Sequence, residues 1–336
     1  MKQVTIPIFV PHLGCPCQCT FCNQRTITGV TPMTAECARE VIESHLSTIP
    51  SQTHTELAFF GGSFTAIRRE DMVSLLQTAI PYLNGGQIRS VRISTRPDAI
   101  DREILSILSA YGVTTVELGI QSIGDEVLYA CQRGHTARDS YRAAELILQH
   151  GLTLGGQMMI GLPASTPEWE EKTARAIVDM GAKEARIYPT VVFANTPLAM
   201  QMQCGLYTPL SVEKAVERTV TPLEIFESGD VKLLRIGLCE SEGLRDNKAV
   251  LGGAYHPAMG ELCYNALYLR RISALLGEIA PDQQSTVKIT VAPGKLSMAI
   301  GQKRRNLLTL QEKFGIRLKF AEDPELKDFA VHAALC

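Results

Sequence analysis

Four cysteines lie close together near the start of the chain, at positions Cys15, Cys17, Cys19 and Cys22. The C-x3-C-x2-C spacing of Cys15, Cys19 and Cys22 lets one irregular loop direct three thiolates at a single metal centre. Closely spaced cysteines also form zinc sites, redox pairs such as Cys19 with Cys22, and disulfide knots. The loop therefore predicts metal or redox chemistry, and the rest of the chain must decide which.

The composition is that of an ordinary globular protein. The 336 residues are 45% hydrophobic and 20% charged, with a net charge of −2 and a mean hydropathy of +0.04. No apolar run is long enough to span a membrane, and Pro7 and Pro11 interrupt the first apolar segment, which we interpret as a strand and not as a signal peptide. We therefore expect a cytoplasmic protein with no membrane partner, in a reducing compartment that disfavours disulfides.

Strand and helix patterns alternate over the first 240 residues. Strands are expected within 1–11 and at 55–60, 90–94, 114–119, 153–160, 184–188 and 231–238, with helices near 33–48, 69–83, 101–110, 138–150, 167–180 and 211–227. Thr31 with Pro32, and Thr166 with Pro167, are expected to begin the first and fifth of these helices.

This alternation predicts an α/β fold with a parallel sheet. Seven strands with six crossovers fit an incomplete barrel, and a doubly wound sheet is the alternative. In either fold, ligands bind at the carboxyl ends of the strands, where the cysteine loop, Gly61-Gly62, Arg96-Pro97-Asp98 and Gln121-Ser122 all fall. The unusual residues are therefore expected on one edge of the sheet.

Several short motifs accompany the cysteine loop. They are Phe21 before Cys22, Gly61-Gly62-Ser63-Phe64-Thr65, Ser94-Thr95-Arg96-Pro97-Asp98, Glu117-Leu118-Gly119-Ile120-Gln121-Ser122, Arg133-Gly134-His135 and Met159-Ile160-Gly161-Leu162-Pro163. Together they resemble the radical S-adenosylmethionine (SAM) superfamily, and within it the group of the elongator catalytic subunit, over roughly residues 1 to 240. The resemblance implies the incomplete (βα)6 barrel of that superfamily.

The resemblance also implies the cofactors. Cys15, Cys19 and Cys22 would bind three irons of a 4Fe-4S cluster, leaving the fourth iron for the amino and carboxylate groups of SAM. One electron from such a cluster cleaves SAM to methionine and a 5'-deoxyadenosyl radical, with a reducing donor such as ferredoxin or flavodoxin as partner. Cys17 is interpreted as a bystander.

By the same resemblance, five residues are expected to bind SAM. Gly61 and Gly62 would offer backbone carbonyls to the methionine ammonium, with Ser63 in place of a common acidic residue. Gln121 would reach the ribose hydroxyls, and Arg133 the methionine carboxylate, which a guanidinium recognises in bidentate fashion. The alternatives are a plain strand-ending turn for the glycines and structural hydrogen bonds for Gln121 and Arg133.

Other polar residues rank below these five. Asp98, Glu117 and Gln157 are expected at strand ends near cofactor or substrate, although caps and salt-bridge partners also occupy such places. His135, His256 and Tyr188 are weaker candidates for acid-base or substrate contacts, because an isolated histidine in a loop is usually structural. No catalytic residue is assigned.

The C-terminal segment is basic. Residues 285–320 carry eight Lys or Arg against the single acid Glu312, and are expected to form a strand at 287–291, helices at 296–300 and 305–314, and a strand at 317–320. This order, with Ile300-Gly301-Gln302-Lys303-Arg304-Arg305-Asn306, resembles a KH module, whose Gly-x-x-Gly loop between two helices clamps a nucleic-acid backbone. Arg304 replaces the second glycine.

The resemblance makes Gly301, Gln302, Lys303, Arg304 and Arg305 the expected RNA contacts. The alternative is a degenerate module that only packs on the barrel. The predicted organisation is a partial barrel over 1–240, a linker with an accessory helix over 241–284, and a small α+β KH-like RNA-binding module over 285–336.

These observations predict a radical SAM enzyme that modifies a base in RNA, with tRNA as the first choice. The elongator catalytic subunit also has an acetyltransferase domain, for which this sequence has no remaining length, so the same product is not expected. One alternative is a radical SAM enzyme acting on a small metabolite or a protein. Another is a non-catalytic protein that binds zinc and RNA.

Overall fold

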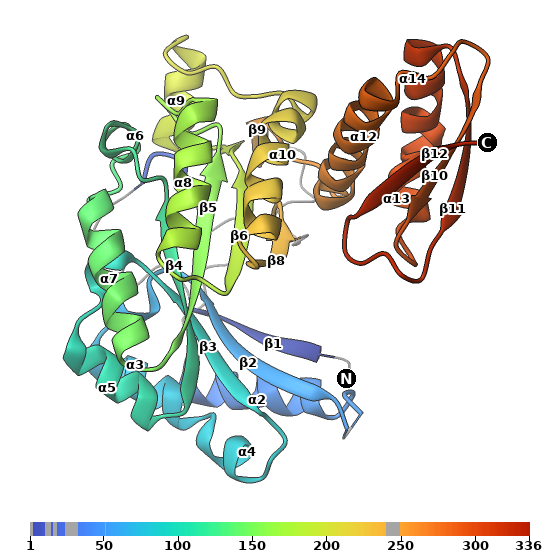
Figure 1. The fold of residues 1–336 in the computed structure, drawn as a ribbon. Helices are drawn as coiled ribbons and strands as arrows, with labels where there is room; N and C mark the ends of the chain where they lie inside the picture. The colour runs from blue at the N-terminus through green and yellow to red at the C-terminus, as the bar shows by residue number, and fades with distance from the viewer. Residues whose placement is uncertain (1–2, 11–14, 16–18, 24–32, 51, 240–248) are drawn as a thin grey trace.

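A curled sheet of seven parallel strands organises the protein (Figure 1). The computed structural model describes residues 3–10, 15, 19–23, 33–50, 52–239 and 249–336. The strands are β1 (Gln3–Val10), β2 (His54–Gly61), β3 (Ser90–Thr95), β4 (Val113–Gln121), β5 (Thr153–Ile160), β6 (Glu184–Pro189) and β8 (Lys232–Ile236).

The strands neighbour one another in chain order, β1-β2-β3-β4-β5-β6-β8. Because parallel crossovers are right-handed, an unreversed order places all connecting helices on one face and leaves the other face concave. The incomplete barrel is therefore confirmed. The doubly wound alternative is wrong, since that fold needs a reversal of strand order.

Helices cover the convex face of the sheet (Figure 1). They are α2 (Ala35–Leu46), α3 (Arg69–Gln77), α4 (Ile80–Asn84), α5 (Arg102–Ala110), α7 (Ala137–Gln149), α8 (Pro167–Asp179) and α10 (Val212–Ser228). Two short helices, α6 (Asp125–Ala130) and α9 (Pro197–Gln203), lie beyond the carboxyl ends of the strands (Figure 1). The six expected helices are present, but the one expected over 69–83 is divided into α3 and α4. The sequence did not predict α6 and α9, or the small antiparallel sheet of β7 (Val191–Phe193) and β9 (Val250–Gly253).

The helix caps follow the sequence in part. Thr166 caps α8 by accepting from the Trp169 backbone N–H at 3.4 Å, with Pro167 in the first turn, as predicted. The expected start at Thr31 and Pro32 lies outside the described residues. The helix begins at Ala35 instead, and the Thr34 hydroxyl accepts from the Cys37 N–H at 3.2 Å.

Buried charges line the concave face. Arg92 of β3 donates to Glu56 of β2 at 2.9 Å, to Glu117 of β4 at 2.8 Å and to Glu184 of β6 at 2.6 Å. The Lys232 ammonium donates to the Gln3 side chain at 3.4 Å and so joins the first and last strands of the sheet. These contacts connect strands across the inside of the curl.

A second core lies in the C-terminal module. Its elements are α12 (Met259–Ile279), β10 (Thr286–Val291), α13 (Leu296–Ile300), η3 (Gln302–Arg304), α14 (Arg305–Phe314), β11 (Arg317–Glu322) and β12 (Val331–Leu335), with sheet order β11-β10-β12. The expected strand-helix-loop-helix-strand order is present, and β12 is an addition. Tyr268, Ile272 and Leu276 of α12 pack into this core.

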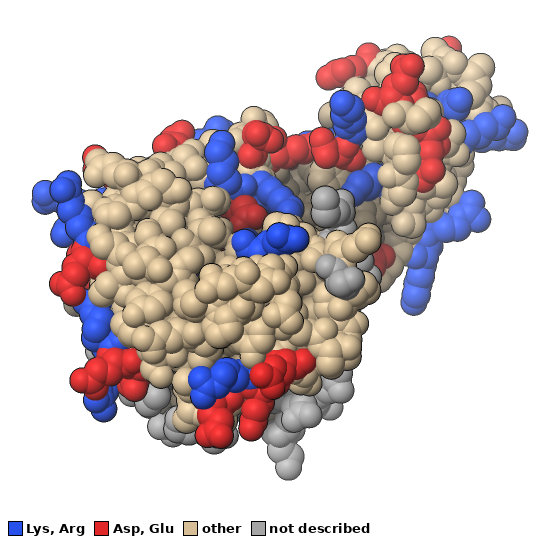
Figure 2. Space-filling model, turned by 90° about the horizontal axis from the view of Figure 1, so that it is seen from below, with Lys and Arg blue, Asp and Glu red and all other residues tan. Residues whose placement is uncertain are grey.

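Charge is distributed unevenly over the surface. Figure 2 shows charged side chains around a broad uncharged face of the barrel, and both signs on the C-terminal lobe. Of the helices in the described ranges, none is long and apolar enough to cross a membrane.

Candidate functional site

The cysteine loop is fastened by the two helices that the sequence did not predict. The Thr20 backbone N–H donates to the Cys131 carbonyl, just after α6, at 3.0 Å, and the Thr20 carbonyl accepts from Leu198 of α9 at 2.9 Å. Phe21 packs against apolar residues beside both helices. The second half of the loop is thus clamped between segments that follow β4 and β7.

Two of the thiols, those of Cys15 and Cys19, lie near the buried guanidinium of Arg133. Cys19 is buried and Cys15 and Cys22 are half-buried. Arg133 Nη1 donates to Cys19 Sγ at 3.3 Å, and its Nη2 donates to the Gly119 carbonyl at 2.8 Å. Burial raises the pKa of Cys15, while the Arg133 charge acts in the opposite direction. Arg133 therefore supplies a positive charge where thiolates would gather.

Arg96 holds Arg133 in place. Its guanidinium donates to both carboxylate oxygens of Asp98, at 2.9 and 2.8 Å, and to the Arg133 carbonyl at 2.6 Å. Arg96 is a residue that sequence reasoning placed in a motif without giving it a role. Asp98 lies after β3, as expected, and is the ion-pair partner of Arg96.

Gln121 is buried with one polar atom unused. Its Oε1 has no hydrogen-bond partner in the described part of the chain, and its backbone is left-handed, with φ 66°. A buried, unpaired acceptor on a strained backbone is typical of a ligand site. Gly119 keeps the space open, since a Cβ there would lie 2.7 Å from Arg133 Nη2 and 3.2 Å from Gln121 Nε2.

Gly61 and Ser63 fasten the end of β2. A Cβ on Gly61, whose φ is +117°, would lie 2.3 Å from the Val10 carbonyl oxygen, so only glycine fits there. The Ser63 hydroxyl lies 2.9 Å from that of Thr95 and accepts from the Arg96 N–H at 3.1 Å. The Ser63 side chain is thus committed to β3 and Arg96, while the Ser63 backbone hydrogen-bonds the Cys15 thiol and favours its thiolate.

Glu117 and Gln157 differ from expectation. Both lie within their strands and not at the strand ends, and Gln157 Nε2 donates to Glu117 Oε2 at 2.8 Å and to Ser94 Oγ at 3.0 Å. Burial alone would raise the pKa of Glu117, but hydrogen bonds and charge from Arg186 and Arg92 hold it below the usual range. Glu117 is a salt-bridge partner on the concave face.

His135 is buried close to Arg133. Burial, reinforced by the Arg133 charge, lowers the pKa of His135 to about 4, so the ring is neutral at pH 7. Tyr188 is half-buried on β6, and burial raises its pKa to about 12. His256 accepts from the Ala258 N–H through Nδ1 at 3.0 Å, which is a local structural role.

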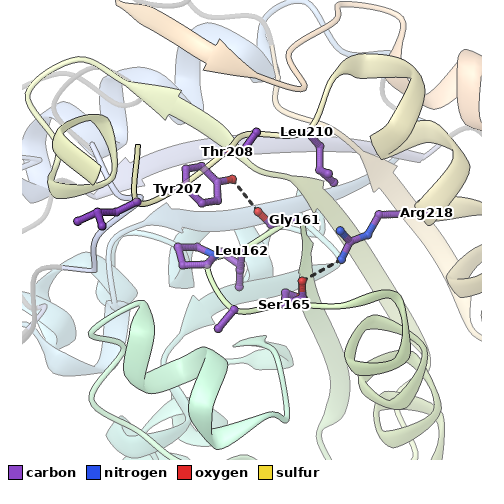
Figure 3. A pocket seen from close by; sticks show the side chains of 10 residues that line it. Gly161, Leu162, Ser165, Tyr207, Thr208, Leu210 and Arg218 are labelled. Atoms are coloured by element: carbon purple, nitrogen blue, oxygen red, sulfur yellow. Dashed lines mark hydrogen bonds between the residues drawn. The ribbon is translucent and has the colours of Figure 1, made fainter. Parts of the chain in front are cut away.

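A small pocket of about 260 Å³ opens at the end of β5 (Figure 3). The Tyr207 hydroxyl donates to the Gly161 carbonyl at 2.7 Å, and Arg218 donates to the Ser165 carbonyl at 3.3 Å and to Glu170 at 2.7 Å. These polar groups bind one another across the pocket. They fix the loop that carries the Gly161-Leu162-Pro163 motif.

The basic loop of the C-terminal module is exposed. Gln302, Lys303, Arg304 and Arg305 are exposed, and none of the three cations pairs with a carboxylate among the residues described. Arg304, at the place of the second glycine, is left-handed with φ 61°, the region that glycine favours. Asn306 anchors the loop by donating to the Asn265 carbonyl at 2.8 Å.

The sequence profile of the Radical SAM superfamily matches residues 9–177, and that of the Radical_SAM C-terminal domain matches residues 182–269. The chain belongs to the radical SAM superfamily. Enzymes of this superfamily work with a 4Fe-4S cluster and SAM, and these are the cofactors of this chain. Family membership favours the radical interpretation of the cysteine loop over the zinc interpretation.

Relatives resemble parts of the chain. The tRNA uridine(34) acetyltransferase of Methanocaldococcus jannaschii is 30% identical over 182 residues, which cover 48% of this chain and 34% of that protein. Elongator complex protein 3 of Saccharomyces cerevisiae is 27% identical over 182 residues, covering 48% and 33%. The chain thus spans about a third of the length of these curated relatives.

Among solved structures, the archaeal Elp3 of Methanocaldococcus infernus superposes with a TM-score of 0.64 at 22% identity, covering 81% of this chain and 64% of that one. At this identity the likeness concerns the fold. It supports the partial barrel as the architecture on which the site is built.

The described residues fit the two cofactors. Three thiols with an adjacent guanidinium suit an iron-sulfur cluster, and the unpaired Gln121 Oε1 suits a hydroxyl donor such as a ribose. No three His, Cys, Asp or Glu side chains of the described ranges already converge as a metal site. The cysteine loop is described only at 15 and 19–23, and Cys17 lies outside these residues.

Proposed function

We propose that this chain is a radical SAM enzyme that modifies a base in RNA, with tRNA as its substrate. Cys15, Cys19 and Cys22 would bind the cluster, and the Gly61–Ser63 backbone, Gln121 and Arg133 would bind SAM. The observation that carries the cofactor assignment is Gln121, whose buried acceptor has no partner in the described part of the chain, 12 residues before the Arg133 that contacts Cys19.

The cluster, when bound, supplies the electron that cleaves SAM to a 5'-deoxyadenosyl radical. The chain positions and shields this chemistry. Arg133 offers charge to the thiolates and to the methionine carboxylate, while Arg96 fixes the Arg133 backbone. The neutral, buried His135 adds no competing charge at pH 7.

Metal analysis of single variants tests the ligand set. After anaerobic purification, Cys15→Ala, Cys19→Ala and Cys22→Ala should each lose iron and sulfide. Cys17→Ala should keep them, as should the control Cys204→Ala, whose thiol is exposed. Stoichiometric zinc without iron or sulfide in the unmodified protein would refute the cluster assignment.

Two observations support RNA as the substrate. The relatives named above are a tRNA uridine(34) acetyltransferase and an elongator subunit. In addition, Lys303, Arg304 and Arg305 form an exposed cationic loop that makes no salt bridge with a described residue. Phosphate contacts by such residues release counterions and make binding salt-dependent.

Mass spectrometry of tRNA nucleosides from cells lacking the protein tests this substrate. We expect at least one modified nucleoside to disappear and to return when the intact gene is restored. An unchanged profile would contradict tRNA modification and direct attention to a small metabolite or a protein as substrate.

Salt-dependent binding tests the docking loop. A Lys303→Glu, Arg304→Glu, Arg305→Glu variant should abolish tRNA binding and its salt dependence, since each lost phosphate contact lowers the log–log salt slope by about 1. The matched control reverses three exposed cations of α7 and α8, with Arg138→Glu, Arg142→Glu and Lys172→Glu. Equal binding by both variants would refute docking by this loop.

A further inference from the structure

The concave face of the barrel carries two neighbouring aromatic rings beside the candidate site, tilted at 43° to each other. Phe9 of β1 and Phe60 of β2 are register partners, so their side chains share this face, and their ring centroids are 6.4 Å apart. The Arg186 guanidinium of β6 lies over the Phe60 ring, with Cζ 5.1 Å from the centroid. Phe9 is 38% exposed, so the surface formed by these rings is open to a ligand.

Glu117 holds the guanidinium of this surface in a fixed plane. Arg186 donates through Nε to Glu117 Oε2 at 2.7 Å and through Nη2 to Glu117 Oε1 at 3.0 Å. Such a bidentate pair fixes orientation and neutralises the charge of Arg186. The surface therefore suits a neutral planar group better than a carboxylate or a phosphate.

Two polar atoms border the surface with hydrogen-bonding capacity to spare. Gln157 Nε2 donates both of its hydrogens, one to Ser94 and one to Glu117. No described residue donates a hydrogen bond to Gln157 Oε1. The Tyr188 hydroxyl also forms no hydrogen bond with a described residue, and its raised pKa keeps it protonated. The surface thus offers one acceptor and one donor.

We propose that Phe9, Phe60, Gln157, Arg186 and Tyr188 form the pocket that receives a single unstacked base of the RNA, with preference for a base that, like uracil, presents an N–H beside carbonyl oxygens. Proteins hold unstacked bases by stacking on aromatic rings and guanidinium planes and select them through hydrogen bonds to the Watson–Crick edge. Gln157 Oε1 accepts the ring N–H, and Tyr188 donates to a carbonyl. This pocket rests on the proposed RNA substrate.

Nucleoside binding to the reconstituted, SAM-loaded protein without reductant tests the pocket directly. Saturation-transfer NMR with uridine, cytidine and adenosine should show uridine bound most tightly. Phe9→Leu, which changes an exposed ring, and Arg186→Lys, which keeps the charge but loses the planar fork, should each weaken uridine binding about tenfold, within the range that base stacking gives. Tyr141→Leu, which removes a similarly exposed ring from the outer helix α7, should have no effect.

The outcomes separate this proposal from the proposed function. Absence of uridine binding, or equal binding by all the variants, would overturn the pocket even if tRNA is modified. Uridine binding that depends on Phe9 and Arg186 would support the pocket even if the tRNA nucleoside profile were unchanged. In that case the pocket would bind a base that does not come from tRNA, and the proposed tRNA substrate would be wrong. Melting temperature and iron content of each variant distinguish loss of binding from loss of folding.

Discussion

At the scale of single residues, the candidate site depends on space as much as on functional groups. Gly119 has no side chain, and Arg133 and Gln121 occupy the volume that a Cβ would need. At 2.7 Å from such a Cβ, the Arg133 guanidinium would have to move, and Gln121, at 3.2 Å, would have to shift slightly. Both residues are expected to bind SAM. The glycine is therefore a positioning residue for both.

Gly119→Ala should weaken SAM binding at least tenfold while retaining the cluster, because the added methyl displaces the Arg133 guanidinium from the Gly119 carbonyl. Equilibrium dialysis of SAM against the reconstituted protein measures this effect. Gly277→Ala is the matched control, because a Cβ there meets nothing within 4 Å. Unchanged SAM affinity in Gly119→Ala would show that Arg133 and Gln121 do not bind SAM.

His135 should make stability depend on pH. Its pKa falls from an ordinary value near 6.5 to about 4 in the folded protein, so between these values the unfolded chain binds a proton that the folded chain does not. Its contribution is fully present above pH 6.5 and is lost as the pH falls toward 4, by about 3 kcal/mol.

Urea unfolding at pH 7 and pH 4.5 measures this dependence. His135→Asn should lose less stability than the unmodified protein on acidification, whereas His54→Asn, at an exposed position of β2, should behave like the unmodified protein. Identical acid sensitivity of all three proteins would contradict a neutral, buried His135.

The site residues divide into those that a sequence can reveal and those that it cannot. Cys15, Cys19, Cys22, Gln121 and Arg133 belong to short motifs, and their residue types already indicate chemistry. Arg96 and Gly119 act by touching segments that are distant in sequence, so only the folded chain shows their roles. Ser63 was expected to face SAM, but its hydroxyl is bound to β3.

At the scale of elements, the periodic strands and long helices were predictable and the short elements were not. The seven strands of the sheet carry apolar residues in short runs or at every second position. Side-chain N-caps begin the helices α2, α5, α7, α8 and α10. By contrast, α6 and α9 have six and seven residues, too few for a helical period to be recognised. These two helices hold the cysteine loop in place. The elements that position the site were therefore the hardest to predict from the sequence.

The buried salt-bridge network around Arg92, on the concave face of the sheet, should contribute strongly to the stability of the fold. Arg92 and its partners Glu56 and Glu117 are at most 5% exposed, and Glu184 is 15% exposed. Arg92→Met would leave these carboxylates buried with Arg186 as the remaining cation of the network, which should cost about 3–5 kcal/mol.

Guanidinium unfolding curves measure the effect of Arg92→Met. Arg175→Met provides the control, because Arg175 pairs with Glu171 on an exposed helix face and should change stability by less than about 1 kcal/mol. A difference between the two variants below 1 kcal/mol would mean that the buried network contributes no more than a surface pair.

At the scale of the whole molecule, α12 connects the two cores. The sequence predicted a linker with an accessory helix over 241–284, and the helix is there, with its second half packed into the C-terminal core. Tertiary packing of this kind is not encoded in helical periodicity alone. Whether the module that α12 joins is a KH-like unit remains a prediction, to be tested by RNA binding.

Two arginines of α12 tie the C-terminal module to the barrel: Arg270, which donates to Thr221 of α10 at 3.0 Å, and Arg271. Arg271 of α12 donates to the Phe329 carbonyl at 2.8 Å and to Glu227 of α10 at 3.1 Å. The Phe329 ring stacks on Tyr264 of α12, with centroids 4.7 Å apart. The Arg271 guanidinium thus joins α10 of the barrel, α12 and the connection between β11 and β12.

If the C-terminal module delivers RNA to the barrel, weakening the contact between them should lower the rate of tRNA modification without lowering tRNA affinity. Arg271→Met should accelerate hydrogen exchange in residues 323–330 and at the end of α10. The affinity for tRNA should stay nearly unchanged, because the basic loop still binds the RNA. The turnover of tRNA should fall, because the RNA is held less firmly over the barrel. Arg102→Met, which removes an exposed arginine of α5 away from this contact, is the control. Parallel losses of affinity and turnover in Arg271→Met would instead mean that Arg271 maintains the RNA-binding surface itself, and unchanged exchange would mean that the contact is held by the stacked rings.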